Sequence, residues 1–277
     1  MVVTVTSLDN PTVKAVRALS RRRERQRERA FMVEGVRLLA DALDAGAIPR
    51  VVLIERELLG TGDEQDRLLV RLAELREGAG RHMRVLEVTP QVMRSVSETE
   101  SPQGIVAVFA FPERTEPREG TPLIVVADGV RDPGNLGTML RAALGAGATI
   151  LYTTPSTVDL YNPKVVRAAM GAHFRLPLRS SVGWEALDEA LDGCEVVWGA
   201  EAEGEEIYSE ADWTAAAALV IGSEDRGLSP QGRARCTGSL AIPLSGGLES
   251  LNAAVASAVI LFEAARQRRL AGDDGER

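Results

Sequence analysis

Five consecutive apolar residues, Leu123 to Ala127, stand directly before the polar, glycine-containing segment 128–134. A strand that is apolar at every position fits a sheet covered by helices on both faces, and such sheets are usually parallel. Shorter apolar runs alternate with helical periodicity through the rest of the chain: strands are expected at 149–152, 196–198, 219–221 and 240–242, and helices near 135–146, 163–172, 184–191 and 251–269. This alternation predicts an α/β fold with a parallel sheet for the second half of the chain.

The first half of the chain shows a shorter alternation of the same kind. Strands are expected at 31–33, 51–54, 85–88 and 105–111, and helices near 11–19, 36–43 and 68–75. Pro11 after Asn10 is typical of a helix start. Segment 112–122 is polar and contains three prolines, which is the composition of a linker. We therefore expect a smaller α/β domain at 1–111, a linker at 112–122 and a larger domain at 123–277.

Composition and charge exclude several classes of protein. The net charge is −8, so any nucleic-acid site must be a local patch rather than the whole surface. The chain has two cysteines and two histidines with no C-x-x-C pair, which argues against a metal site and favours a reducing compartment. It has neither a signal peptide nor a run of about 20 apolar residues, so we expect a cytoplasmic protein with no membrane span.

Three loop segments of the second half follow strands and are rich in glycine and polar residues. Ligands of parallel α/β sheets bind at the carboxyl ends of strands, so these segments are the candidate site. In 128–141, Asn135 is placed to cap the helix, and Arg141 follows nearly two turns later, roughly on the same side. In 221–229, Gly222 at the strand end would let a ligand approach the backbone. Segment 242–252 is glycine-rich but lacks the G-x-x-x-x-G-K-[ST] pattern, which excludes a P-loop.

Each segment alone also fits an ordinary strand-to-helix turn, but in order they resemble the motifs of the SpoU-type RNA 2′-O-ribose methyltransferases of the SPOUT superfamily. Those motifs are N-x-G-x-x-x-R, G-x-E-x-x-G-L and I-P-x-x-G-x-x-x-S-L-N-x-x-x-A. The matching residues are Asn135, Gly137 and Arg141; Gly222, Glu224, Gly227 and Leu228; and Ile242, Pro243, Gly246, Ser250, Leu251, Asn252 and Ala256. A weaker resemblance, at 31–35 and 101–105, is to the small RNA-binding domain that many members carry.

The resemblance implies a fold, a cofactor and a set of site residues. The fold is a parallel sheet with a deep trefoil knot in its C-terminal segment, and the protein is a homodimer with the active site near the subunit interface. The cofactor is S-adenosylmethionine, with no metal. The resemblance places backbone contacts to this cofactor around Ala200, Gly222, Ile242 and Leu251, and the catalytic residues at Arg141, Asn135, Glu224, Ser250 and Asn252.

Arg141 corresponds to the activating residue of that family. The pKa of an arginine exceeds ~12, which makes direct abstraction of the hydroxyl proton difficult. Orienting the hydroxyl, or stabilising a developing alkoxide, is physically easier for a guanidinium. Both roles stay open from the sequence.

Basic residues are concentrated near the amino terminus. The stretch from Lys14 to Arg37 holds nine basic and three acidic residues, which favours contact with RNA phosphates over a merely solvated helix face. Arg21, Arg22 and Arg23 are the candidate RNA-binding residues, with Arg167 as a further one.

Family analogy favours ribosomal RNA, because the accessory domain is more typical of ribosomal members. The alternatives are a transfer RNA ribose methyltransferase, a base methyltransferase and a non-catalytic RNA-binding protein of the same fold.

Overall fold

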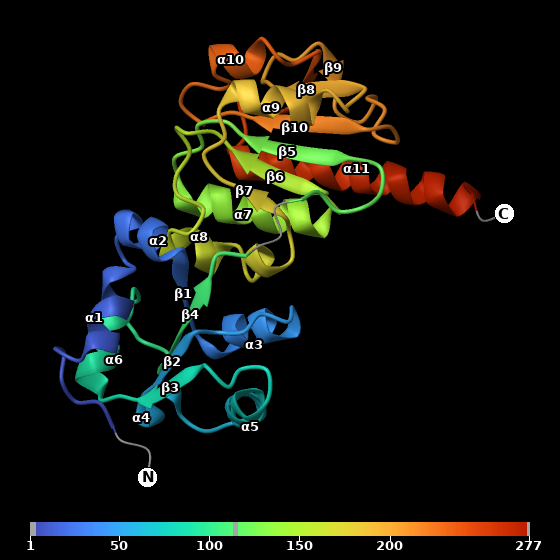
Figure 1. Ribbon diagram of the computed structural model, residues 1–277. Coiled ribbons are helices and arrows are strands. Elements are labelled where there is room, and N and C mark those ends of the chain that lie inside the picture. Colours follow the sequence, from blue (N-terminus) through green and yellow to red (C-terminus); the bar gives the residue numbers. More distant parts are fainter. Residues whose placement is uncertain (1–3, 113–115, 276–277) are drawn as a thin grey trace. The chain divides into compact units, whose positions relative to one another are not determined.

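The computed structural model describes residues 4–112 and 116–275, with side chains up to 272 in the last helix. The chain divides into two compact units, one of Met1–Pro112 with Tyr161–Phe174 and one of Glu113–Leu160 with Arg175–Arg277 (Figure 1). Residues 113–115 of the expected linker lie outside the described residues. Farther along that segment, the Arg118 amide donates to the Thr149 carbonyl at 3.0 Å, so this part of it is attached to the second unit.

The first unit is built on a four-stranded sheet in the order β1-β4-β2-β3. β4 is antiparallel to both β1 and β2, and β2 is parallel to β3. The Asn10 side chain accepts the Thr12 amide at 2.9 Å, which confirms the predicted helix start. The strands are β1 (Ala30–Glu34), β2 (Val51–Ile54), β3 (Arg84–Glu87) and β4 (Ile105–Ala110), and the helices are α1 (Pro11–Ala18), α2 (Arg22–Glu28), α3 (Val36–Asp44), α4 (Arg56–Leu59), α5 (Asp63–Glu77) and α6 (Pro90–Val96).

Segment 161–174, which carries α8 (Pro163–Ala168) and the 3₁₀ turn η1 (Ala172–Phe174), belongs to the first unit. Its aromatic residues pack on those of β1 and the end of β4. Tyr161 stacks on Phe111 with ring centroids 3.8 Å apart, and Phe174 lies 4.9 Å from Phe109. Phe31, which is fully buried, touches both Tyr161 and Phe174. A stretch inside the range expected for the larger domain therefore shares the core of the first unit.

The second unit contains a seven-stranded sheet in the order β7-β6-β5-β10-β8-β11-β9, and every pairing in it is parallel. The predicted parallel α/β sheet is thus confirmed, and the Leu123–Ala127 run is its buried strand β5. The other strands are β6 (Ile150–Thr153), β7 (Leu178–Arg179), β8 (Val196–Ala200), β9 (Glu206–Ile207), β10 (Ala217–Ile221) and β11 (Gly238–Ala241), and the helices are α7 (Pro133–Gly145), α9 (Trp184–Leu191), α10 (Pro230–Arg233) and α11 (Ala253–Gly275). Among the described residues, none of the helices is long and apolar enough to cross a membrane.

Helix α11 packs along α7 and is fastened to the sheet near its carboxyl end by Arg268 (Figure 1). The Arg268 guanidinium donates four hydrogen bonds of 2.7–2.8 Å to backbone carbonyls of segments far apart in the sequence. These segments lead into β5 and β10, so one side chain holds the amino ends of the two central strands against the last helix. The acceptors are the carbonyls of Thr121, Pro122, Trp213 and Ala215.

Replacing Arg268 with Met should destabilise the second unit selectively. The change keeps an apolar stem but leaves four carbonyls without their charged donor, and we expect a loss of about 3–5 kcal/mol in the free energy of unfolding. The melting temperature of this unit should fall by roughly 10 °C. All three tryptophans, Trp184, Trp198 and Trp213, lie in the second unit, so tryptophan fluorescence reports its unfolding alone.

Arg269→Met is the matched control. The Arg269 side chain is exposed, and among the described residues it donates only to the Ala265 carbonyl of its own helix, at 3.3 Å. This variant should unfold within about 0.5 kcal/mol of the wild type. Equal melting temperatures for the two variants would show that Arg268 does not hold the strands.

Candidate active site

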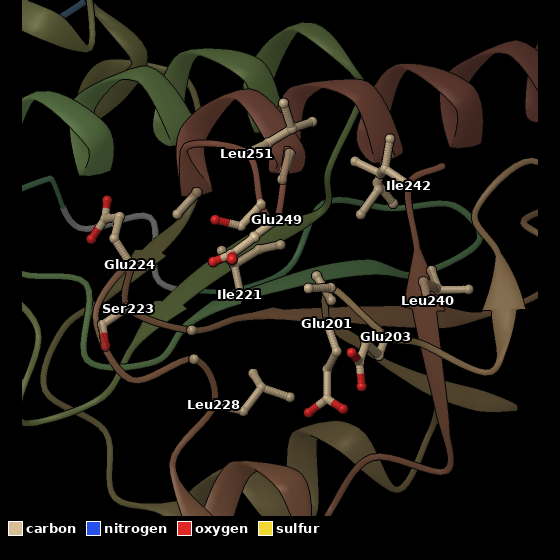
Figure 2. Close-up of a pocket in the computed structure, with 18 of the residues that line it drawn as sticks. Glu201, Glu203, Ile221, Ser223, Glu224, Leu228, Leu240, Ile242, Glu249 and Leu251 are labelled. Atoms are coloured by element: carbon tan, nitrogen blue, oxygen red, sulfur yellow. The ribbon is translucent and has the colours of Figure 1, made fainter. Parts of the chain in front are cut away.

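A cavity of about 950 Å³ opens at the carboxyl ends of β8, β10 and β11, beside the start of α11 (Figure 2). Its lining includes apolar side chains such as Leu240 and Ile260, and its size is that of a pocket for a small-molecule cofactor. The structure brings all four residues expected near the cofactor to this cavity. They are Ala200, Gly222, Ile242 and Leu251, and the expected catalytic residues Glu224 and Ser250 line it as well.

Three side chains from the three sequence motifs form a hydrogen-bonded chain. Asn252 caps α11, since its Oδ1 accepts the amides of Ala254 at 3.0 Å and Val255 at 3.2 Å. Its Nδ2 donates to Asn135 Oδ1 at 2.9 Å, and Asn135 Nδ2 donates to Glu224 Oε1. The cap makes Oδ1 of Asn252 an acceptor, so the orientation of both amides follows from it. The second carboxylate oxygen of Glu224 takes no part in this chain.

Asn135 does not cap α7, and that expectation from the sequence is wrong. The N-cap is Asp132, whose Oδ1 accepts the Asn135 amide at 2.8 Å. Pro133 occupies the first helical position, where its missing N–H costs nothing. Because Asp132 caps the helix, the Asn135 carboxamide is left to bond with Asn252 and Glu224.

Gly222 is required for a reason that the sequence alone does not indicate. A Cβ atom at this position would lie 2.1 Å from the Gly227 carbonyl carbon and 2.4 Å from the Leu228 amide nitrogen. Ser223 and Gly227 exchange two backbone hydrogen bonds, of 3.0 and 2.8 Å, which close a tight turn with Glu224 at its tip. The glycine thus lets the turn fold back on its own backbone, because a side chain at this position would collide with that backbone.

Arg141 is exposed on α7 and is not among the residues that line the cavity. A spacing of six residues rotates the side chain by about 240° at 3.6 residues per turn. Arg141 therefore lies about 120° around the helix from Asn135, not on the same side, and that expectation is corrected. Within one chain, the structure brings together Asn135, Glu224 and Asn252 but not Arg141.

Asp128, which was not predicted as a site residue, links the loop after β5 to the loop after β10. It is 2% exposed, and its carboxylate accepts the Ser229 amide at 2.7 Å and the Thr154 hydroxyl at 3.2 Å. Ser229 follows the turn 223–227, so Asp128 holds that turn against the loop after β5. Its position directly after an entirely apolar strand was the available sequence signal.

Acidic side chains surround the far end of the cavity from Glu224. Glu201 and Glu203 lie there, and Glu249 lines the cavity between the two ends (Figure 2). Arg233 pairs with Glu201 at 2.8 Å, which leaves an excess of negative charge. A pocket lined by both apolar side chains and carboxylates fits a ligand that carries an aromatic base and a positive charge, as S-adenosylmethionine does.

Both cysteine thiols are partly buried and weakly acidic. Burial raises the pKa of both Cys194 and Cys236 to about 11, so both thiols stay protonated near neutral pH. In the part of the chain that the structure describes, no three His, Cys, Asp or Glu residues are grouped as metal ligands would be.

The basic stretch of the first unit is partly structural. Arg25 is 2% exposed and donates to the carbonyls of Leu19 at 2.8 Å and Ser20 at 2.7 Å. Arg21, Arg22 and Arg23 are exposed where α2 begins. Arg167 on α8 is half-buried and lines a small pocket that also contains Glu34 and Glu98.

Comparison with known proteins agrees with this geometry over both units. The model of the SpoU rRNA Methylase family matches residues 122–262, and that of the MRM3-like substrate binding domain matches residues 10–107. The human mitochondrial rRNA methyltransferase 3 is 32% identical over 90% of this chain and 70% of its own length. The Bacillus subtilis 23S rRNA (guanosine(2553)-2′-O)-methyltransferase RlmP is 31% identical over 93% of this chain and 97% of its own.

Solved structures give the same result. An AdoMet-bound rRNA methyltransferase from Sinorhizobium meliloti is 32% identical, with a TM-score of 0.79 over 95% of this chain and 97% of that one. The SpoU methyltransferase AviRb from Streptomyces viridochromogenes, in complex with AdoMet, is 29% identical, with a TM-score of 0.81 over 94% of this chain and 98% of that one. With the family model covering half of the chain and these relatives covering nearly all of it, the chain belongs to the SpoU rRNA methylase family.

Proposed function

We propose that this chain transfers the methyl group of S-adenosylmethionine to a ribose 2′-hydroxyl of ribosomal RNA. The observation that carries the proposal is the meeting of Asn135, Glu224 and Asn252, one from each motif, beside a cofactor-sized cavity. Ribosomal RNA is favoured over transfer RNA because the human and Bacillus relatives are named as rRNA methyltransferases and a substrate-binding domain of that type matches 10–107. The bacterial relative also favours a cytoplasmic location.

S-adenosylmethionine supplies an electrophilic methyl group on a positively charged sulfur. Backbone around Ala200, Gly222, Ile242 and Leu251 would hold it, with the carboxylates of the cavity facing its positive charge. Ala200 is the last residue of β8, and the other three lie in the loops that follow β10 and β11, at the carboxyl edge of the sheet where ligands of parallel α/β sheets bind. In this proposal the backbone binds the cofactor. The side chains of Asn135, Glu224 and Asn252 bind and orient the ribose.

Glu224 is the residue best placed to receive the substrate hydroxyl. Its Oε1 accepts from Asn135, so Oε2 can accept a hydrogen bond from the ribose or from a guanidinium. The cap of α11 by Asn252 holds this arrangement in place before any substrate arrives. Ser250, in the loop before α11, is the further polar group for the ribose.

Arg141 would complete the site across a dimer interface. Helix α11 leaves three large apolar side chains about half exposed along its length, Val255 (48%), Phe262 (51%) and Leu270 (55%), which is a surface that a second copy could bury. α7 packs along α11, so a partner bound there would meet Arg141 as well. We propose a homodimer in which each Arg141 serves the partner's cavity, and a C-terminal segment threaded as the trefoil knot that the resemblance implies.

Gly222→Ala should abolish binding of S-adenosylmethionine. A single methyl group at this position overlaps the backbone of Gly227, so the turn must open and the wall of the cavity moves. Isothermal titration calorimetry should show at least a 100-fold weaker Kd with the secondary structure retained.

Gly193→Ala is its control, because a Cβ there meets no atom within 4 Å. It should bind the cofactor as the wild type does. Normal affinity in Gly222→Ala would remove this turn from the cofactor site.

Arg141→Ala should leave cofactor affinity unchanged and lower turnover by a factor of roughly 10²–10⁴. Arg141→Lys should also be slow, because an ammonium does not reproduce a planar group with several fixed donors. Single-turnover methylation of ribosomal RNA, followed by nuclease digestion and mass spectrometry of the nucleosides, measures the rate and distinguishes ribose from base methylation.

Mixing the two inactive variants tests the shared site. A heterodimer of Arg141→Ala and Gly222→Ala protomers has one site with an intact cavity and the partner's intact Arg141, so mixing should restore part of the activity. A mixture as inactive as its parts would place Arg141 in its own chain's site. Near-normal rates in both Arg141 variants would contradict its catalytic role.

Reversing the charge of Arg21, Arg22 and Arg23 to Glu should weaken RNA binding by at least 10-fold at 0.1 M salt and flatten its salt dependence, because fewer counterions are released. Fluorescence anisotropy with labelled RNA measures both quantities. The matched control reverses Arg67, Arg76 and Arg81, three exposed arginines of the same unit. Equal losses in the two triple variants would mean that only net charge matters and that the start of α2 is not an RNA-binding surface.

A further inference from the structure

Two arginines approach Asp225, the residue that follows Glu224 in the turn 223–227, and neither is among the residues that line the cavity. Arg131 lies in the loop between β5 and α7, and Arg226 follows Glu224 by two residues in the turn 223–227. Both guanidinium groups approach one carboxylate, with Arg131 Nη1 and Arg226 Nε each 3.6 Å from Asp225 Oδ2. A charge-assisted hydrogen bond measures about 2.7–2.9 Å, so these contacts are loose and most donors of both groups remain available. The two side chains are 57% and 73% exposed.

The backbone that carries these arginines is held in place. In the first loop, the Gly129 amide donates to the hydroxyls of Thr154 and Thr157, at 3.0 Å each. The turn 223–227 is closed by its own two backbone hydrogen bonds. Asp128 joins the two loops through the Ser229 amide. A ligand that binds both arginines therefore does not have to order the loops first, which lowers the cost of binding.

Charge along the cavity is unequal, and this indicates which ligand the arginines meet. Glu201 and Glu203 lie at the opposite end from Glu224 (Figure 2), so a polyanion is repelled there. At the Glu224 end, the guanidinium groups of Arg131 and Arg226 balance the carboxylates of Glu224 and Asp225, so the repulsion of a polyanion is weaker there. A hydrogen bond from Ser223, together with the charges of Arg131 and Arg226, holds the pKa of Asp225 below its ordinary value, so this carboxylate is ionised at neutral pH.

We propose that Arg131 and Arg226 form a phosphate-binding site that grips the RNA backbone next to the ribose to be methylated. Every internal 2′-hydroxyl of RNA lies between two phosphodiesters, so a ribose that reaches Glu224 brings phosphates to these two side chains. Asp225 is the resident counter-ion: it keeps the guanidinium groups in place until a phosphate takes over the pairing. The site rests on the proposed function and is separate from the basic surface at the start of α2.

The double variant Arg131→Ala/Arg226→Ala tests this site. We expect RNA affinity to fall 10- to 100-fold at 0.1 M salt and the slope of log affinity against log salt to decrease by about 1–2, which corresponds to the loss of one or two phosphate contacts. The Kd for S-adenosylmethionine should stay within twofold of the wild type. The probe is unmodified 23S ribosomal RNA transcribed in vitro. Arg76→Ala/Arg269→Ala removes two exposed charges elsewhere and should bind RNA nearly as the wild type does.

Asp225→Asn should have the opposite effect. Without the competing carboxylate, RNA should bind severalfold more tightly and with a steeper salt dependence. The proposal is overturned if the arginine double variant binds RNA like its control, or if Asp225→Asn weakens binding as much as the double variant does. Because RNA binding is measured without turnover, these outcomes decide the phosphate site even if the wild type methylates no ribose, a result that would contradict the proposed function alone.

Discussion

Helix α11 is fastened to the sheet by polar contacts at both of its ends, and the rest of the second unit depends on this. At its start, Asn252 uses one oxygen to cap the helix and its amide nitrogen to align Asn135. Near its end, Arg268 gathers the carbonyls that precede β5 and β10. The helix therefore fixes the carboxyl edge of the sheet, where the cavity opens, and the amino edge, where the central strands begin. Packing alone would leave the helix free to slide, whereas directional hydrogen bonds set its position along the sheet.

Charge is divided on the second unit in a way that the net charge conceals. Carboxylates line the cavity, where a positively charged cofactor is expected, and two guanidinium groups pair with Asp225 in the turn that carries Glu224, where a phosphate backbone is expected. An acidic protein can therefore serve an RNA substrate, because salt screens charges beyond about 8–10 Å and each ligand responds to its own surroundings. Neighbouring residues of the turn 223–227 therefore have different expected roles. On the proposed function, Glu224 would bind the ribose and Arg226 would bind the phosphate next to it.

Much of the fold follows from the sequence, because local physics decides those parts. The apolar run Leu123–Ala127 can be satisfied only by cover on both faces, and it is a central buried strand. The three segments that carry Asn135, Glu224 and Asn252 were expected at one edge because parallel strands end there, while the choice of these residues came from the family resemblance. The prediction of the N-cap of α7 was wrong because two nearby residues can both cap a helix. Asp132 and Asn135 are both good caps, and only the position of Pro133 decides between them.

Other features depend on tertiary contacts that no local pattern encodes. The side chain that Gly222 lacks would meet backbone five residues away, which the strand-end position does not reveal. Arg25 looks like its arginine neighbours in the sequence, yet it is buried because two carbonyls at the end of α1 need a donor. The boundaries of the two units also depend on tertiary contacts. The apolar spacing of α8 predicts that one of its faces is buried, but it does not predict which sheet covers that face.

The return of segment 161–174 to the first unit means that the chain passes between the two units three times. A cut in 112–122 would therefore not release an intact second unit. Tyr161 and Phe174 would lose the ring contacts that Phe31, Phe109 and Phe111 provide, and their apolar surface would face water. Burying such aromatic side chains is worth about 1.5–3 kcal/mol each, a large share of the stability of a domain. The part of the chain that resembles an RNA-binding domain is thus also a folding partner of the methyltransferase sequence.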